Sequence, residues 1–161
     1  MKMPSNVAAW LQLKLYLLTL SGYSADSFTC AKPGELNDDL KFRWQLAVDM
    51  IYRGVTCGLM DVWDGVNKTG MGLTHSLELV KALAQFDPND SDSAEECWFG
   101  PEIDATDLCV ALVEKYDIQS VASREICVPF IAEIEVLFER HGVSWSNAPL
   151  IELGSGAAAG N

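Results

Sequence analysis

The spacing of apolar residues limits most strongly what this chain can fold into. Apolar side chains recur three or four positions apart, as in Leu40, Trp44, Ala47, Val48 and Ile51. This period places them on one face of an α-helix, whereas a half-buried strand alternates with a period of two. We find no strand-like alternation of any length in the 161 residues. The pattern therefore predicts an all-α fold.

The first two helices are expected to lie at the centre of the core. The first spans Asn6–Ser21 behind a Ser5 cap, and it is apolar around most of its circumference, which indicates contacts on several sides. The second spans Asn37–Arg53. Its pattern weakens at two glycines, Gly54 and Gly58, which indicate a kink or a close approach of another helix, and then resumes through Leu59, Val62 and Trp63.

Three further helices are expected in the second half of the chain. Proline interrupts the last one, at Pro129, which indicates a kink or the first turn of a shorter helix. The first of these helices begins after a Thr74 cap and ends at Asp87-Pro88, and the second begins after an Asp104 cap and ends at Tyr116. The third begins after a Ser120 or Ser123 cap and runs to Arg140, and Gly142 stops it.

These elements predict a compact single-domain bundle of five to six helices. Residues 1–153 form the helical domain, and the helices Asn6–Ser21, Asn37–Arg53 and Ser123–Arg140 form the centre of its core. The sixth helix is a short turn at Ala94–Trp98. Residues 154–161 contain only Gly, Ala, Ser and Asn and are expected to be a disordered tail.

The charge balance restricts the class of partner. The chain has 23 acidic and 11 basic residues, a formal net charge of -12 and a pI near 4.4. Such a surface repels nucleic acid phosphates and anionic lipid headgroups, and it attracts basic proteins. We therefore expect a basic protein partner, with no nucleic acid and no membrane. A plainer interpretation is that the acidity only keeps the protein soluble.

Metal, cofactor and catalytic motifs are absent from the sequence. The five cysteines contain no Cys-x-x-Cys pair, and neither His75 nor His141 has a second ligand at zinc spacing. The segment after Asp87 lacks the glycine and the final glutamate of a calcium loop. No nucleophile elbow, P-loop or dinucleotide fingerprint occurs. We expect no metal, no cofactor and no enzymatic activity.

The cysteine count and the N-terminus bear on location. An odd number of cysteines favours a reducing compartment, and the expected location is cytoplasmic. The apolar run Val7–Leu20 is shorter than the roughly 20 apolar residues that span a bilayer, and Gln12 and Lys14 interrupt it. We interpret it as a buried helix, with a signal peptide as the alternative.

The stretch Phe86–Asp107 is the favoured binding segment. It is rich in Asp and Glu and contains no Lys or Arg. We expect the aromatic side chains of Trp98 and Phe99 to be its anchors, because aromatic anchors dominate interface energies. Core packing of Trp98 is the equal alternative. The charged rim is expected at Asp90, Asp92, Glu95 and Glu96.

A second acidic pair flanks a tryptophan. Asp61 and Asp64 stand on either side of Trp63 and are three positions apart, which would place them together on a helix face. We expect this pair to extend the binding surface. The alternative is an ordinary solvated face.

Two segments give the chain a resemblance to a known class. Gly58–Asp64 and the acidic stretch Asp87–Asp107, in a small helical chain without catalytic motifs, resemble the immunity proteins that neutralise bacterial polymorphic toxins. The resemblance implies a stoichiometric complex that blocks the active site of a toxin. Two other classes stay open: an adaptor or secretion chaperone, and a helical enzyme with a carboxylate site.

Overall fold

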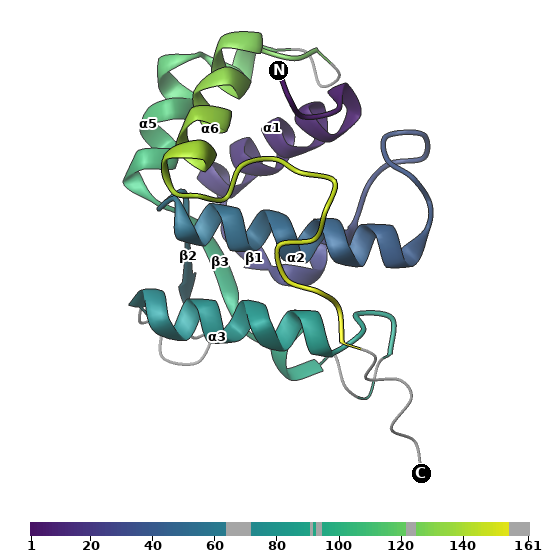
Figure 1. Cartoon of the computed structure of the whole chain (residues 1–161). Helices are drawn as coiled ribbons and strands as arrows, with labels where there is room; N and C mark the ends of the chain where they lie inside the picture. Colours follow the sequence, from purple (N-terminus) through teal and green to yellow (C-terminus); the bar gives the residue numbers. More distant parts are fainter. Residues whose placement is uncertain (64–71, 91, 93–94, 122–124, 155–161) are drawn as a thin grey trace.

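The computed structural model describes residues 1–63, 72–90, 92, 95–121 and 125–154. Most of this part of the chain is helical, and a small sheet packs against the helices (Figure 1). The elements are α1 (Ser5–Leu20), β1 (Tyr23–Ser24), η1 (Ala25–Thr29), α2 (Leu40–Thr56), β2 (Met60–Trp63), α3 (Gly72–Gln85), the π-helix η2 (Glu95–Phe99), β3 (Glu102–Ala105), α5 (Asp107–Lys115), η3 (Ile118–Ser120) and α6 (Val128–Arg140).

The sheet shows that the all-α prediction is wrong. Three antiparallel strands pair in the order β1-β3-β2, so that β3 is central. Val62 of β2 faces Ile103 of β3, and both side chains are completely buried. Because side chains alternate between the two faces of a strand, the residues on either side of Val62 and Ile103 point away from the core. The fold is mostly helical with a small antiparallel sheet.

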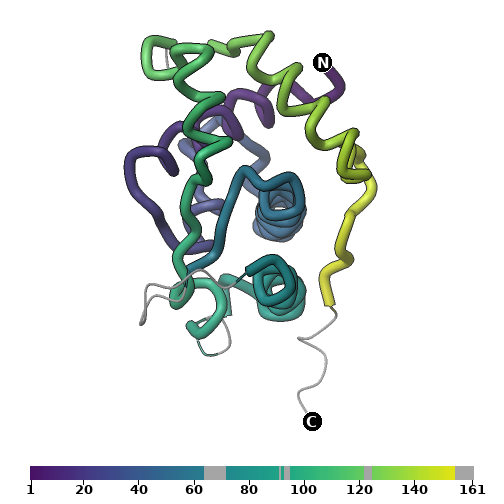
Figure 2. The backbone as a smooth tube through the Cα atoms, turned by 90° about the vertical axis from the view of Figure 1, so that its left-hand side faces the viewer, coloured from purple at the N-terminus to yellow at the C-terminus, as the bar shows by residue number. Residues whose placement is uncertain are grey.

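The helix α2 occupies the middle of the molecule. It lies between α3 and the group formed by α1, α5 and α6 (Figure 1), and Figure 2 shows α2 and α3 side by side and nearly end-on. Its buried residues lie on several faces, as expected for an element covered from more than one side. The indole of Trp44 donates a hydrogen bond to the carbonyl oxygen of Leu83 in α3 at 2.8 Å.

Residues 143–154, which we name the C-terminal strap, run from the end of α6 across α2 to the end of α3 (Figures 1 and 2). Buried Arg53 of α2 donates to the carbonyl oxygens of Val143 and Ser144, each at 2.9 Å. Asp49 accepts the backbone N–H groups of Leu150 and Ile151 at 3.1 and 3.3 Å. All four of these hydrogen bonds go to backbone atoms of the strap, and the guanidinium of Arg53 also lies 5.3 Å from the ring centre of Trp145 in the strap.

The C-terminal limit of α2 differs from the prediction, because the helix does not resume through Trp63. Gly58 has a φ of 70°, a left-handed conformation that glycine adopts without steric cost. The N–H of Leu59 bonds to the carbonyl of Gly54 and that of Gly58 to the carbonyl of Val55, which is a Schellman motif. The chain then reverses into β2. A Cβ atom on Gly54 would collide with the side chain of Met60, so the close approach at Gly54 comes from a strand.

The predicted starting points of the last two helices, α5 and α6, are also wrong. Asp104 lies in β3 and caps no helix. Thr106 caps α5 instead, where its hydroxyl accepts the N–H of Cys109 at 3.3 Å. The last helix begins at Val128, so it is the shorter of the two predicted forms, with Pro129 in its first turn. Ser120 ends η3, and Ser123 lies outside the described residues.

The first three helices also start at other residues than predicted. Ser5 lies inside α1 and does not cap it, Asp39 caps α2 at Leu40, and Thr74 lies inside α3, which starts at Gly72. The first helix covers Ser5–Leu20, and α3 ends at Gln85, just before Asp87-Pro88. Gly142 stops α6 with a φ of 71°. Gly154 was predicted to begin a disordered tail, but its N–H donates to the carbonyl of Ala84 at 2.9 Å. Residues 155–161 lie outside the described part of the chain.

Candidate protein-binding surface

Three carboxylates lie together on the outer face of the sheet. Asp61 of β2 is directly opposite Asp104 of β3, and Glu102 lies two residues before Asp104 on the same side of β3. We name these three residues the acidic sheet face. The partners at their neighbouring positions, Val62 and Ile103, are buried on the inner face. The alternation within two four-residue strands therefore brings the carboxylates together.

The backbone of Gly22 approaches this face closely. A Cβ atom added to Gly22 would collide with the carboxylate oxygens of Asp104 and Glu102. Any larger residue at this position would have to push the two side chains aside. Glycine thus lets the connection between α1 and β1 pass directly beside the carboxylates.

Like charges repel one another across the acidic sheet face. Partial burial raises the pKa of Asp104 above its ordinary value, and repulsion from Glu102 and then Asp61 raises it further. None of the three carboxylates forms an ion pair with another described residue. Like charges directly opposite in a sheet destabilise the pairing. The fold therefore keeps an electrostatic conflict that a cation from outside could relieve.

The structure places Trp98 in the core. Its side chain has 0% exposure, and its indole N–H donates to the carbonyl oxygen of Phe86 at 2.6 Å. The prediction that Trp98 is an exposed aromatic anchor is therefore wrong, and the alternative prediction that it packs in the core is confirmed. Phe99, the next residue, is 51% exposed and stays a candidate for an apolar contact.

The predicted rim residues all lie at the surface. Glu95 and Glu96 are exposed in the first turn of η2, and Asp90 and Asp92 are exposed before it. Asp61 lies in a strand and not on the predicted helix face. Asp64, its predicted partner, lies outside the described residues.

Sequence reasoning missed Glu102 and Asp104 as surface partners of Asp61. The sequence pattern predicts Asp104 as a helix cap, and it marks Glu102 only as a member of the acidic stretch. The run Glu102-Ile103-Asp104-Ala105 does alternate polar and apolar residues. Four residues of alternation are too few to identify a strand without its neighbours. Phe86, which is 44% exposed, was also missed as an apolar surface residue.

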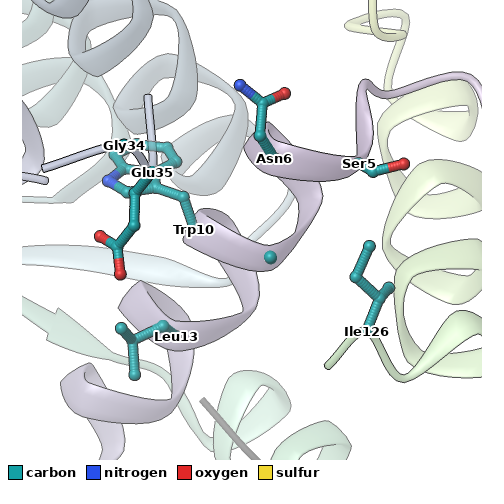
Figure 3. Close-up of a pocket in the computed structure, with 8 residues that line it drawn as sticks. Ser5, Asn6, Trp10, Leu13, Gly34, Glu35 and Ile126 are labelled. Atoms are coloured by element: carbon teal, nitrogen blue, oxygen red, sulfur yellow. The ribbon is translucent and has the colours of Figure 1, made fainter. Parts of the chain in front are cut away.

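A cavity of about 240 Å³ lies beside the first half of α1 (Figure 3). Trp10 and Ile126 contribute two of its walls, and each wall is fixed. The indole N–H of Trp10 donates to the carbonyl oxygen of Cys30. The side chain of Gln12 donates to the carbonyl oxygen of Glu125 and accepts the N–H of Cys127, the two residues that flank Ile126. Glu35 is the one ionisable residue in the lining. Neither Asp49 nor Asp104, whose pKa values are raised, lies in this lining.

Within the described ranges, no three His, Cys, Asp or Glu side chains are placed to hold a metal ion. The acidic sheet face is thus a surface feature and not a preformed metal site. No helix in that part of the chain is both long and apolar enough to cross a membrane.

Comparisons of the chain with protein-family models, curated proteins and solved structures found no match.

Proposed function

We propose that this protein is a non-enzymatic, cytoplasmic inhibitor that binds one basic protein, a toxin, in a stoichiometric complex. The acidic sheet face is the observation that carries the proposal. The three carboxylates of this face repel one another, and none of them forms an ion pair with a Lys, Arg or His side chain of the described residues. A Lys or Arg side chain of a partner would turn this repulsion into charge-assisted hydrogen bonds.

Two further features support a basic partner. The net charge of -12 attracts a basic protein over a distance and speeds the encounter, whereas close contacts determine how slowly the complex dissociates. Phe99 lies three residues before Glu102 and is 51% exposed, so the surface beside the carboxylates offers an apolar contact. Trp98, the residue before Phe99, is buried and donates its indole N–H to the carbonyl oxygen of Phe86, just after the end of α3.

The experiment begins with the gene beside this one. Its product is expressed with and without this protein, and toxicity, complex stoichiometry and association kinetics are measured between about 50 and 500 mM salt. The proposal expects relief of toxicity, a one-to-one complex and an association rate that falls steeply with salt, because salt screens exposed charges. An adaptor would instead bind several proteins with a weak salt dependence.

A matched pair of variants separates the acidic sheet face from net charge. Glu102→Lys reverses a charge on this face, and Glu152→Lys reverses an exposed charge on the C-terminal strap. Both change the net charge by the same amount. Glu102→Lys should raise the dissociation constant by a factor of ten or more, since it places a cation against the partner's cations. Equal effects of the two variants would show that net charge alone matters, and the acidic sheet face would be the wrong site.

A further inference from the structure

A groove of about 400 Å³ opens between the C-terminal end of α1 and α5. Its apolar side chains are Tyr16, Leu20, Val110 and Val113, and its polar ones are Thr19, Glu114, Asp117 and Gln119. Leu20 is 64% exposed at the C-terminal end of α1, so its side chain is accessible beside the other apolar residues of the groove. The lining contains two carboxylates and no basic residue.

The groove adjoins the acidic sheet face. Leu20 is the last residue of α1, and two residues later Gly22 lies against the carboxylates of Asp104 and Glu102. On the opposite wall, α5 begins at Asp107, directly after β3 and its Thr106 cap. One partner could therefore contact the carboxylates and the groove together.

The polar rim of the groove is fixed by the backbone. Asp117 has a φ of 48°, in the left-handed region, at the end of α5. Its N–H donates to the carbonyl of Glu114 at 3.1 Å, and its carbonyl accepts the N–H of Ser120 at 3.0 Å. Asp117 and Glu114 are both exposed, so their carboxylates are accessible beside the apolar floor.

We propose that this groove receives an apolar side chain of the basic partner, with Lys or Arg residues beside it that face Glu114 and Asp117. The inference rests on the proposed function and specifies how the partner is recognised. Charge complementarity favours this occupant over a second copy of the chain, because two copies that each carry a net charge of -12 repel. An apolar anchor with a charged surround is the usual composition of an interface core and rim.

The test is a nuclear magnetic resonance titration of the full ¹⁵N-labelled chain with three synthetic peptides. The first is acetyl-Lys-Lys-Leu-Phe-Lys-Lys-amide, the second replaces Leu-Phe by Ser-Ser, and the third replaces every lysine by glutamate. The first peptide should bind roughly tenfold more tightly than the second, because it buries apolar surface. It should shift the amide signals of Leu20, Val110 and Asp117. The third should not bind.

Two variants connect this preference to the groove. Leu20→Ser should remove the preference for the first peptide over the second. Leu40→Ser, at a 59% exposed leucine on α2, should leave it unchanged. Asp117→Asn keeps a residue that tolerates the left-handed conformation and removes the charge, so it should weaken binding of the first peptide severalfold.

Three results would overturn the inference. Equal binding of both lysine peptides, with shifts confined to the acidic sheet face, would refute the groove and leave the proposed function standing. Absence of binding by either lysine peptide would count against both. Self-association of the free chain that Leu20→Ser abolishes would show that a second copy covers the groove.

Discussion

Replacement of Arg53 by methionine should destabilise the fold more than the loss of any surface cation. Arg53 has 0% exposure, and its guanidinium lies 5.3 Å from the ring centre of Trp145 and 5.8 Å from that of Phe138. Two of its nitrogens donate to carbonyls of the C-terminal strap. Methionine fills a similar volume but donates no hydrogen bond, so two strap carbonyls would lose their partner.

The magnitude follows from these contacts. A hydrogen bond to a charged group contributes about 1.5–3 kcal/mol, so the two strap bonds contribute roughly 3–6 kcal/mol. Methionine recovers part of this, because burial of a guanidinium is itself costly. We expect a net loss of about 3–5 kcal/mol, within the range measured when one partner of a buried charged pair is removed. For a chain of this length the melting temperature should fall by roughly 10 °C.

Urea denaturation followed by tryptophan fluorescence measures the change, and Arg140→Met is the matched control. Arg140 is exposed at the end of α6, so its replacement should cost less than about 0.5 kcal/mol. Hydrogen exchange at Leu150 and Ile151 should accelerate in Arg53→Met, because the strap is released. The error of one such comparison is roughly 1 kcal/mol. If the unfolding free energies of the two variants differ by less than this, the hydrogen bonds from Arg53 to the strap do not stabilise the fold.

Two further predictions concern the acidic surface. Trp98→Ala should lower the unfolding free energy by about 3–5 kcal/mol, whereas Phe99→Ala should change it by less than about 0.5 kcal/mol; thermal melts that rank them the other way would contradict the burial of Trp98. Asp104→Asn should stabilise the free protein at pH 7, because the raised pKa of Asp104 means that its ionised form is disfavoured in the fold. The penalty on folding is fully present above the folded pKa of Asp104, and it is gone below the ordinary pKa of 3.8. The advantage of the variant should therefore shrink as the pH falls toward the ordinary value of 3.8, and denaturation curves across this range would show whether it does.

The helices were predictable from the sequence because their apolar residues are arranged as helices require. The period of three and four in α2 leaves little room for another assignment, and the long apolar run of α1 is typical of a buried helix. The strands were not predictable in the same way. Met60 and Val62 continue the apolar spacing of α2 closely enough to imitate a helix, and only the Schellman motif at Gly58 separates the two elements. A strand of two residues such as β1 has no periodicity to detect.

The binding surface was predictable in composition but not in geometry. The acidic stretch and the exposure of Phe99 could be expected from the sequence. The pairing of Asp61 with Asp104 depends on the register between β2 and β3, which are far apart in the chain. A register shift of one residue would have sent these carboxylates to opposite faces. Trp98 could not be assigned, because a tryptophan beside acidic residues suits a core and an interface equally.

The bonds between α2 and the C-terminal strap also have a consequence for the order of folding. Arg53 and Val143 are 90 positions apart, and Asp49 and Leu150 are 101 apart. Contacts this distant in sequence close late, because chain entropy must be lost before they form. Before the strap packs against α2, the side chains of Arg53 and Asp49 stay hydrated. Their burial without the strap's hydrogen-bond partners would cost free energy. We therefore expect an intermediate in which the helices have collapsed while this face of α2 is still hydrated, and docking of the strap as the step that excludes the water.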